Sequence, residues 1–236
     1  MGVGAGLYPT PFASRVWTPA ALAPHAWYRA DMGISLVGAR IAAWADQSGN
    51  GHDLVQTTAP LRPALVAASR GDVGFAAIDT AGGTYLETTI TLPRELAIVA
   101  VTGTVRSTGY LLSHTIGFTE DLYFYSGGDA TFYLREPPSY YRTTVSQPAI
   151  VSNTNHVAQY DGAQITLGRN GVDVPMGAPV GTPINNVDVA GTLRVGTSGT
   201  GAGGASLELI ELVICPPLTA PQLASLEAYF ARLGRP

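Results

Sequence analysis

The sequence of 236 residues predicts an all-β protein: a two-sheet antiparallel jelly-roll sandwich that carries one α-helix at its C-terminal end. Segments of four to ten residues rich in Val, Ile, Thr, Tyr and Phe recur between Gly, Pro, Asn and Asp residues, a pattern typical of a sandwich or barrel. Charged residues make up 13% of the chain, against roughly 25% in an ordinary soluble domain. Uncharged polar residues and glycine must therefore cover much of the surface, which suits a protein rich in turns.

Thirteen strands are expected, at residues 25–30, 41–44, 73–78, 84–87, 95–104, 110–114, 122–125, 130–134, 140–145, 155–160, 164–169, 192–195 and 207–215. The strand at 95–104 is apolar on both faces, because Leu96 and Ile98 alternate with Ala97 and Val99. A strand of this kind is covered on both sides, so we place it in the middle of a sheet.

Two tight turns are expected between the later strands. Asp161-Gly162 lies between the strands at 155–160 and 164–169, and Asp-Gly is a strong hairpin signal. Asn170-Gly171 follows directly and predicts a second turn.

The C-terminal helix is predicted from its caps and from one apolar face. Thr219 and Gln222 have capping-box spacing, Pro221 lies in the first turn, and Gly234 follows the last turn. Leu223, Leu226, Phe230 and Leu233 share one face, which we expect to dock on the sandwich. Thr18-Pro19 predicts one further helical turn near the other end.

No break in composition divides the interior, so residues 15–236 are expected to form one domain behind an arm at residues 1–14. The arm has no charged side chain and is too short to form a core of its own. Burying Leu7, Tyr8 and Phe12 against a neighbouring subunit would offset the entropy of ordering them. The sequence thus predicts an assembly arm and a homo-oligomer, and the alternative is an arm that folds back along its own sandwich.

Composition excludes several classes of function. All 13 basic residues are arginines, so the chain has no phosphate-loop lysine and no Schiff-base lysine. With a net charge of −4 and no basic run, it is not expected to bind nucleic acid. No stretch approaches the roughly 18 apolar residues of a membrane span, and residues 1–11 do not have the pattern of a signal peptide. The single cysteine, Cys215, excludes an internal disulfide and is expected to be a small buried hydrophobic residue.

Three stretches together resemble a known family. They are AWYRAD at 26–31 with WADQSGNGHDL at 44–54, HVAQYDGAQITLGRNGVDV at 156–174, and the segment from LRVGTSG to the C-terminal helix at 193–234. In order and spacing they resemble the laminin-G-like jelly-roll domains of the concanavalin A-like lectin/glucanase superfamily. The resemblance implies two antiparallel sheets packed face to face, often with a ligand or calcium site among the loops at one rim. Members occur as carbohydrate-binding modules, in secreted adhesive proteins and in phage structural proteins.

Aromatic residues gather between residues 123 and 142, and the candidate glycan-binding residues among them are Tyr123, Tyr125, Tyr140, Tyr141 and Arg142. Tyr133 and Arg135 lie in the same segment. Tyrosine rings pack against sugars, and arginine forks hold oxygens, so an exposed group of this kind would be a recognition surface. The alternative is core packing, because strand alternation should bury about half of these residues.

The loop at 46–53 is the most polar in the chain. Asp46, Asn50 and Asp53 offer oxygens that calcium could use, which makes calcium the one cofactor to consider. The alternative is that these residues make turns and hydrogen bonds that fix the loop.

No catalytic residue is predicted, so the chain is not expected to be an enzyme. Glu208 and Glu211 are three apart in a strand, which predicts opposite faces, whereas a retaining glycosidase needs two carboxylates on one face about 5 Å apart. Residues 199–204 match GxGxxG, but a strand follows, and this favours a hairpin connection. The four histidines do not have the spacing of a metal site and are expected at the surface or in turns.

Two classes of function follow. The first is a structural component of a phage virion (capsid decoration, tail or fibre), with other protein subunits as partners and glycan as a further ligand. The alternative is a lectin-like carbohydrate-binding module of a secreted or surface protein.

Overall fold

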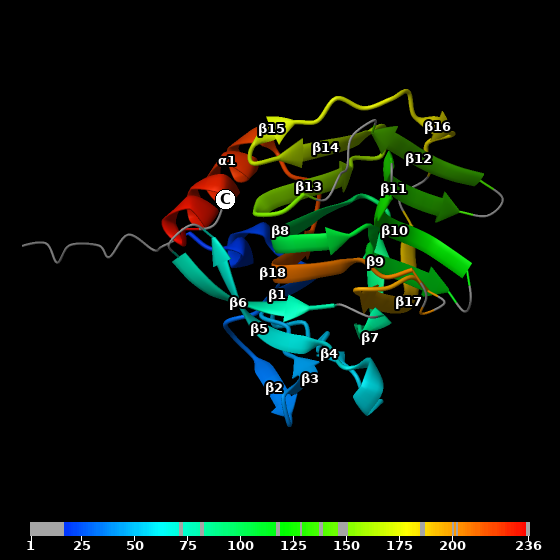
Figure 1. Cartoon of the computed structure of the whole chain (residues 1–236). Coiled ribbons are helices and arrows are strands. Elements are labelled where there is room, and N and C mark those ends of the chain that lie inside the picture. Colours follow the sequence, from blue (N-terminus) through cyan, green and yellow to red (C-terminus); the bar gives the residue numbers. More distant parts are fainter. Residues whose placement is uncertain are drawn as a thin grey trace, which may run out of the picture.

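Antiparallel β-strands make up most of the fold. The computed structural model describes residues 17–234, except 71–72, 81–82, 117–118, 128, 137–138, 146–150, 185–186, 200 and 202. Within these residues the chain forms 18 strands, two short 3-10 helices and one α-helix (Figure 1). No helix of the described part is long and apolar enough to cross a membrane.

In chain order the elements are η1 (Pro19–Leu22), β1 (Ala26–Arg29), β2 (Ile34–Val37), β3 (Arg40–Trp44), β4 (Leu54–Val55), η2 (Ala59–Leu61), β5 (Ala64–Arg70), β6 (Val73–Asp79), β7 (Leu86–Pro93), β8 (Leu96–Ser107), β9 (Gly109–Ile116), β10 (Thr119–Gly127), β11 (Asp129–Glu136), β12 (Ser139–Val145), β13 (Thr154–Tyr160), β14 (Ile165–Arg169), β15 (Val172–Asp173), β16 (Val180–Gly181), β17 (Asp188–Val195), β18 (Ser206–Cys215) and α1 (Ala220–Arg232). Each predicted strand overlaps an observed one. The strands β2, β4, β5, β15 and β16 were not predicted, and most of them are short.

The strands form two layers, which Figure 1 views edge on. The first sheet contains β1, β18, β8, β13, β14 and β15, with β6 paired to the beginning of β18. The second sheet contains β7, β17, β9, β10, β11, β12 and β16. Pairings of β3, β4 and β5 connect the two layers at one side. The predicted two-sheet antiparallel sandwich is confirmed.

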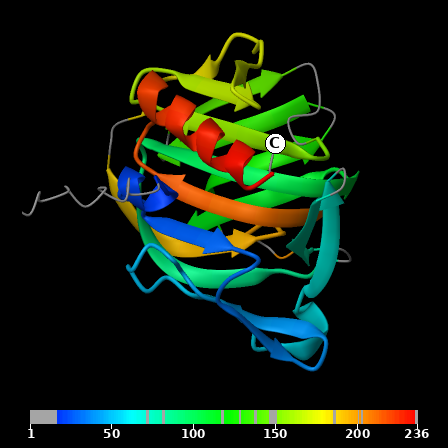
Figure 2. The same cartoon turned by 90° about the vertical axis from the view of Figure 1, so that its left-hand side faces the viewer.

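The inner core fills the space between the two sheets and contains Leu96 and Ile98 of β8. A second apolar cluster lies on the outer face of the first sheet, where α1 lies across β13 and β8 beside β18 (Figure 2), and Trp27 of β1 belongs to the same cluster. There Ala97 and Val99 lie in one cluster with Leu226 and Phe230 of the helix. The central strand is therefore covered on both sides, as its sequence predicts.

The predicted caps and turns are present. The backbone N–H and the hydroxyl of Thr219 both donate to Gln222 Oε1, at 2.9 and 2.8 Å. Asp161 Oδ1 accepts hydrogen bonds from the backbone N–H groups of Ala163 and Gln164 in the turn between β13 and β14. The next turn has positive φ at both central residues, +47° at Asn170 and +73° at Gly171, as a two-residue hairpin of type I′ requires.

Two sequence-based expectations are corrected. The glycine-rich segment 199–204 joins β17 of the second sheet to β18 of the first, so it is a crossing between layers and not a hairpin. His114 and His156 are buried, because strand alternation turns both side chains to the inner faces of their sheets: His114 lies opposite Leu122 and Leu193 of the inner core, and its Nε2 is 3.2 Å from the carbonyl oxygen of Ile90.

Cys215 is buried in the cluster under α1, as expected, and burial raises the pKa of its thiol to about 12. The predicted arm at residues 1–14, with Leu7, Tyr8 and Phe12, lies outside the described residues, so its role stays a prediction.

Candidate functional site

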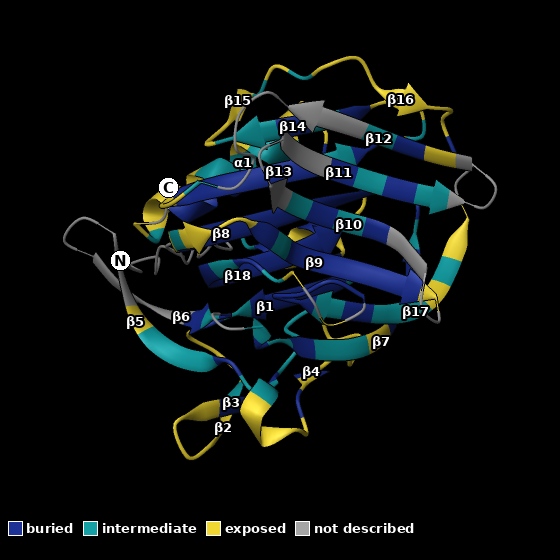
Figure 3. Cartoon of the chain, turned by 45° about the vertical axis from the view of Figure 1, so that its right-hand side comes forward, coloured by how far each residue is buried: buried dark blue, intermediate teal, exposed yellow. Residues whose placement is uncertain are grey.

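The outer face of the second sheet is rich in tyrosine. Along β10, Leu122 and Phe124 are buried in the inner core, while Tyr123 and Tyr125 lie on the opposite face and are half-buried. Alternate buried and half-buried bands follow β10 and β11 in Figure 3. The period of two residues in a strand thus brings one set of aromatic rings into the core and leaves another set at the surface.

The surface rings pack against one another across the strands. Tyr123 lies directly opposite Tyr133 of β11, and their rings are stacked with centroids 4.6 Å apart and planes 8° from parallel. The ring of Tyr140 in β12 continues the stack, 6.1 Å from that of Tyr133. Tyr110 of β9 packs against Tyr125 at 4.8 Å and against Tyr123 at 5.3 Å. We call these five residues, Tyr110, Tyr123, Tyr125, Tyr133 and Tyr140, the tyrosine row.

Two arginines border the row. In the pairing of β11 with β12, Tyr133 lies opposite Arg142 and Arg135 lies opposite Tyr140, so tyrosine and arginine alternate in a two-by-two pattern. The Arg142 guanidinium carbon is 5.9 Å from the centre of the Tyr140 ring, at the outer limit of a cation–π contact. Tyr140, which borders these arginines, is the most accessible residue of the tyrosine row, with 40% of its surface exposed.

Tyr141 does not belong to this surface, which corrects the predicted group. It is 4% exposed, lies in the inner core, and packs its ring against Tyr160 at 5.6 Å. Adjacent residues of a strand point to opposite faces, so Tyr140 and Tyr141 could not both line one surface. Tyr123, Tyr125, Tyr140 and Arg142 do lie together on the outer face.

The sequence did not point to Tyr110. Phe124 and Tyr125 are consecutive, but they pair with Leu112 and Tyr110, so β9 has an extra residue, Leu111, at a β-bulge. Without the bulge, alternation from Leu112 would place Tyr110 on the inner face. The one sequence signal is Gly109, since a glycine in a strand often marks a bulge or a close approach of two backbones.

The polar loop at 46–53 is held by its own hydrogen bonds. Asp46 Oδ1 accepts from the backbone N–H groups of Trp27 and Ser48, both at 2.9 Å, and Asp46 Oδ2 accepts from the hydroxyl of Ser48 and the N–H of His52. Asp53 Oδ1 accepts from the N–H of Asp46 at 2.9 Å. The amide of Asn50 donates to the carbonyl oxygens at positions 24 and 25. Asp46 and Asn50 thus tie the loop to the start of β1, and Asp53 holds the loop to itself.

Calcium at this loop stays a prediction, which calorimetry with millimolar calcium would test. In the part of the chain that the structure describes, no group of three or more His, Cys, Asp or Glu residues is placed to hold a metal ion.

Glu208 and Glu211 lie on the same side of the first sheet, which corrects their predicted opposite faces. Irregularities in the pairing of β18 with β8 fall between Leu209 and Glu211, and they interrupt the alternation. Glu211 is fully buried under α1 and accepts hydrogen bonds from Trp27 Nε1 at 2.7 Å and from the hydroxyl of Tyr229 at 3.1 Å. Glu208 is ion-paired with Arg106.

No protein-family model matches the chain, and no curated protein matches it in sequence. Among solved structures, it is similar to the binding domain of Paraclostridial Mosquitocidal Protein 1, with a TM-score of 0.62 and 12% identity over 90% of this chain. It is similar to the botulinum neurotoxin serotype D ligand-binding domain in complex with N-acetylneuraminic acid, with a TM-score of 0.56 and 8% identity over 90% of this chain. It is also similar to domain 4 of AbnA, an extracellular arabinanase from Geobacillus stearothermophilus in complex with arabinotriose, with a TM-score of 0.50 and 12% identity over 86% of this chain.

The chain spans 53% of the length of the mosquitocidal and neurotoxin chains and 98% of the arabinanase domain. At these identities the likeness concerns the fold. The chain therefore shares its β-sandwich architecture with these domains.

Proposed function

We propose that this protein is a non-catalytic glycan-binding module whose binding surface is the tyrosine row with Arg142. The observation that carries the proposal is the row itself: five tyrosine rings from four neighbouring strands pack in contact on an outer sheet face. A side chain that served only the core would point inward, as Phe124 and Phe132 do.

The chemistry of the row suits sugars. Tyrosine offers a large amphipathic contact area at a low cost in side-chain entropy, and arginine offers several donors in a rigid fork. Because the rings of Tyr123, Tyr133 and Tyr140 stack face to face, a ligand would meet ring edges and hydroxyl groups more than open ring faces. The stack also holds the rings in place before a ligand arrives, which reduces the entropy lost on binding.

Two further observations support the proposal. Two of the similar structures are complexes with a sugar, arabinotriose in one and N-acetylneuraminic acid in the other. The strand-turn-strand unit with Asp161-Gly162 and Asn170-Gly171 is present, so membership of the laminin-G-like family is part of the same proposal. We place the module on a secreted or surface protein.

The absence of catalysis is also a proposal. Glu211, the acid most suggestive of a glycosidase, is enclosed by Trp27 and Tyr229 under α1 and could not reach a sugar without undocking the helix. We expect no release of reducing sugar from common polysaccharides. Release that disappears in Glu211→Gln would contradict this.

Binding is tested with the full chain on a glycan array, followed by titration of the best ligand. Tyr133→Ala and Tyr140→Ala should each weaken binding about tenfold or more, because each removes a central aromatic contact. Tyr141→Phe is the matched control: it changes a tyrosine of the same strand, but in the core, and should bind as the natural protein does. The proposal fails if no glycan binds, or if the two alanine variants bind unchanged.

The virion role predicted from the sequence is a separate proposal. It rests on the arm at residues 1–14 and is compatible with glycan binding, since a host-facing virion protein can carry such a module.

A further inference from the structure

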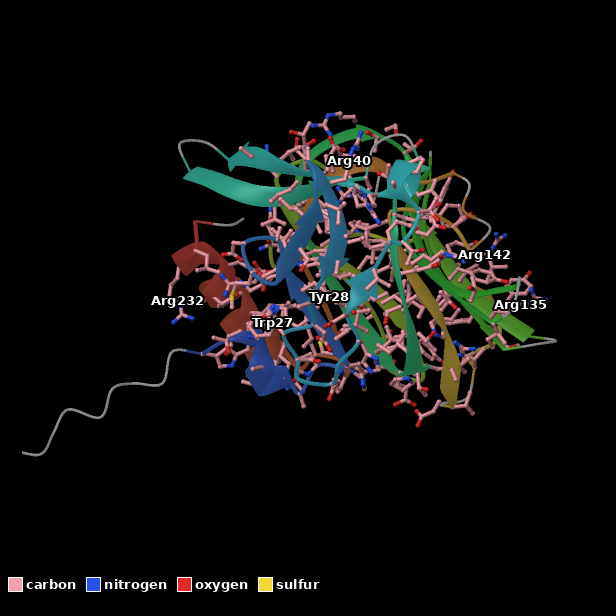
Figure 4. All side chains as sticks on the ribbon, turned by 90° about the horizontal axis from the view of Figure 1, so that it is seen from below. Trp27, Tyr28, Arg40, Arg135, Arg142 and Arg232 are labelled. Atoms are coloured by element: carbon pink, nitrogen blue, oxygen red, sulfur yellow. The ribbon has the colours of Figure 1, made fainter. Side chains whose placement is uncertain are left out.

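Arg135 and Arg142 are diagonal neighbours on the tyrosine face. They lie on β11 and β12, which are directly paired, and each is opposite a tyrosine of the row. Diagonal positions on adjacent strands are about 7 to 8 Å apart, and an arginine side chain is long enough to span half of that distance. Figure 4 shows the two side chains on the same side of the molecule, away from Arg40 and Arg232.

Three other arginines form ion pairs with carboxylates. Arg29 pairs with Asp31 at 2.6 Å, Arg106 pairs with Glu208, and Arg194 pairs with Glu87 at 2.7 Å. By contrast, within the described residues the guanidinium groups of Arg135 and Arg142 have no ion pair and no hydrogen bond, and that of Arg142 lies over the ring of Tyr140.

Stability does not explain Arg142. Its Nε is buried without a hydrogen-bond partner, and an unsatisfied buried donor lowers stability. The contact with Tyr140 orients the guanidinium, and its terminal amino groups remain as the donors that a ligand could use.

We propose that the glycan is anionic, and that Arg135 and Arg142 together hold a carboxylate or a sulfate ester on the sugar while the tyrosine row packs against the sugar rings. This inference rests on the proposed function and specifies its ligand class. An arginine fork matches a planar carboxylate or the oxygens of a sulfate, and charge-assisted hydrogen bonds of this kind are about twice as strong as neutral ones. The chain as a whole carries a net charge of −4, but salt screens charges beyond about 8 Å, so the local pair dominates at this face.

The test compares pairs of glycans that share one sugar backbone, of which one member is acidic and the other is neutral. The carboxylate arm compares a galacturonate hexamer with its methyl ester, and the sulfate arm compares dextran sulfate with dextran. In one of the two pairs we expect the acidic glycan to bind about tenfold or more tightly than the neutral glycan. This preference should become smaller as the salt concentration is raised. The arm that shows the preference identifies the anionic group.

Variants assign the preference to the two arginines. Arg135→Gln with Arg142→Gln should abolish it. Arg40→Gln with Arg232→Gln is the matched control, because it removes the same charge from exposed arginines elsewhere and should leave the preference intact. Melting temperatures of both double variants show that the fold is retained.

The outcomes separate the two proposals. Equal binding of acidic and neutral partners, with loss of both in Tyr133→Ala, overturns the anionic ligand and keeps the glycan-binding function. A preference that survives in the Arg135/Arg142 double variant, or that is lost equally in the control, also overturns it. If no member of either pair and no glycan on the array binds, both proposals fail.

Discussion

Glu211 joins the C-terminal helix to the first sheet through buried hydrogen bonds. Its carboxylate is fully buried and accepts hydrogen bonds from Trp27 of β1 and Tyr229 of α1, so one side chain of β18 connects three elements. A polar side chain is tolerated in a protein interior only when it is hydrogen-bonded. Tyr229 and Trp27 therefore have a polar role in addition to their apolar packing.

Replacing Glu211 by leucine should lower the free energy of unfolding by about 3 kcal/mol, because it leaves the indole N–H and the phenol O–H buried without an acceptor. Glu211→Gln keeps an acceptor oxygen and should cost about 1 kcal/mol. Urea unfolding measures both values. Equal losses in the two variants would show that the hydrogen bonds do not matter.

At the scale of elements, α1 is held by its apolar face and its N-terminal cap. Leu226 and Phe230 are fully buried against the first sheet, while Ala224 and Ala228 face solvent. The 13-residue helix is close to the length at which an isolated helix is marginal in water, so its stability comes mainly from docking.

Leu226→Ala and Phe230→Ala should each lower the free energy of unfolding by about 2 to 5 kcal/mol, through lost burial and the cavity left behind. Ala228→Ser is a control on the exposed face and should change it by less than about 1 kcal/mol. Thermal or urea unfolding reports the difference. An unchanged melting temperature in the two core variants would mean that the helix is not docked.

At the scale of the whole molecule, the two covered faces of the first sheet bury several ionisable groups in neutral form. Burial raises the pKa of the Tyr229 hydroxyl to about 12 and that of the Cys215 thiol to about 12, and it raises the pKa of Tyr28 well above 10. In the unfolded chain these groups ionise near their ordinary values, about 8.5 for cysteine and about 10 for tyrosine.

The folded protein therefore binds more protons than the unfolded chain between about pH 9 and pH 12, so its stability should fall as the pH rises through this range. The stabilising contribution is complete below the unfolded pKa values and is lost as the pH approaches the folded ones. Urea unfolding at a series of pH values measures the slope. It should be shallower in Tyr229→Phe and in Cys215→Ala, and a slope that neither variant changes would contradict this origin.

A further prediction for the whole molecule concerns the arm at residues 1–14. Removal of residues 1–14 should leave a folded sandwich that no longer assembles, since the sequence predicts a domain that begins at residue 15 and an arm too short to form a core of its own. Circular dichroism and light scattering on the full and shortened chains test this. Unfolding of the shortened chain would count against an assembly arm, as would a full-length monomer at high concentration with its arm protected from protease.

Features that depend on residues close together in the chain could be predicted from the sequence. The strands, the turns at Asp161-Gly162 and Asn170-Gly171, and the cap at Thr219 follow from hydrophobic period and turn chemistry within a few residues. The two apolar faces of residues 96–101 also predicted that β8 is covered on both sides. Short strands such as β4 and β15 were not predicted, because two residues are too few to show the alternation of apolar and polar residues.

Which side chains of separate strands come into contact could not be predicted from the sequence. The bulge at Leu111 brings Tyr110 into the tyrosine row. The irregular pairing of β18 puts Glu208 and Glu211 on one side of the sheet. The register of β12 places Tyr141 in the inner core. The pattern of Tyr133 and Tyr140 with Arg142 and Arg135 likewise depends on the register of β11 with β12. Register and bulges are set by pairing between separate segments, and a shift of one residue moves every side chain to the other face.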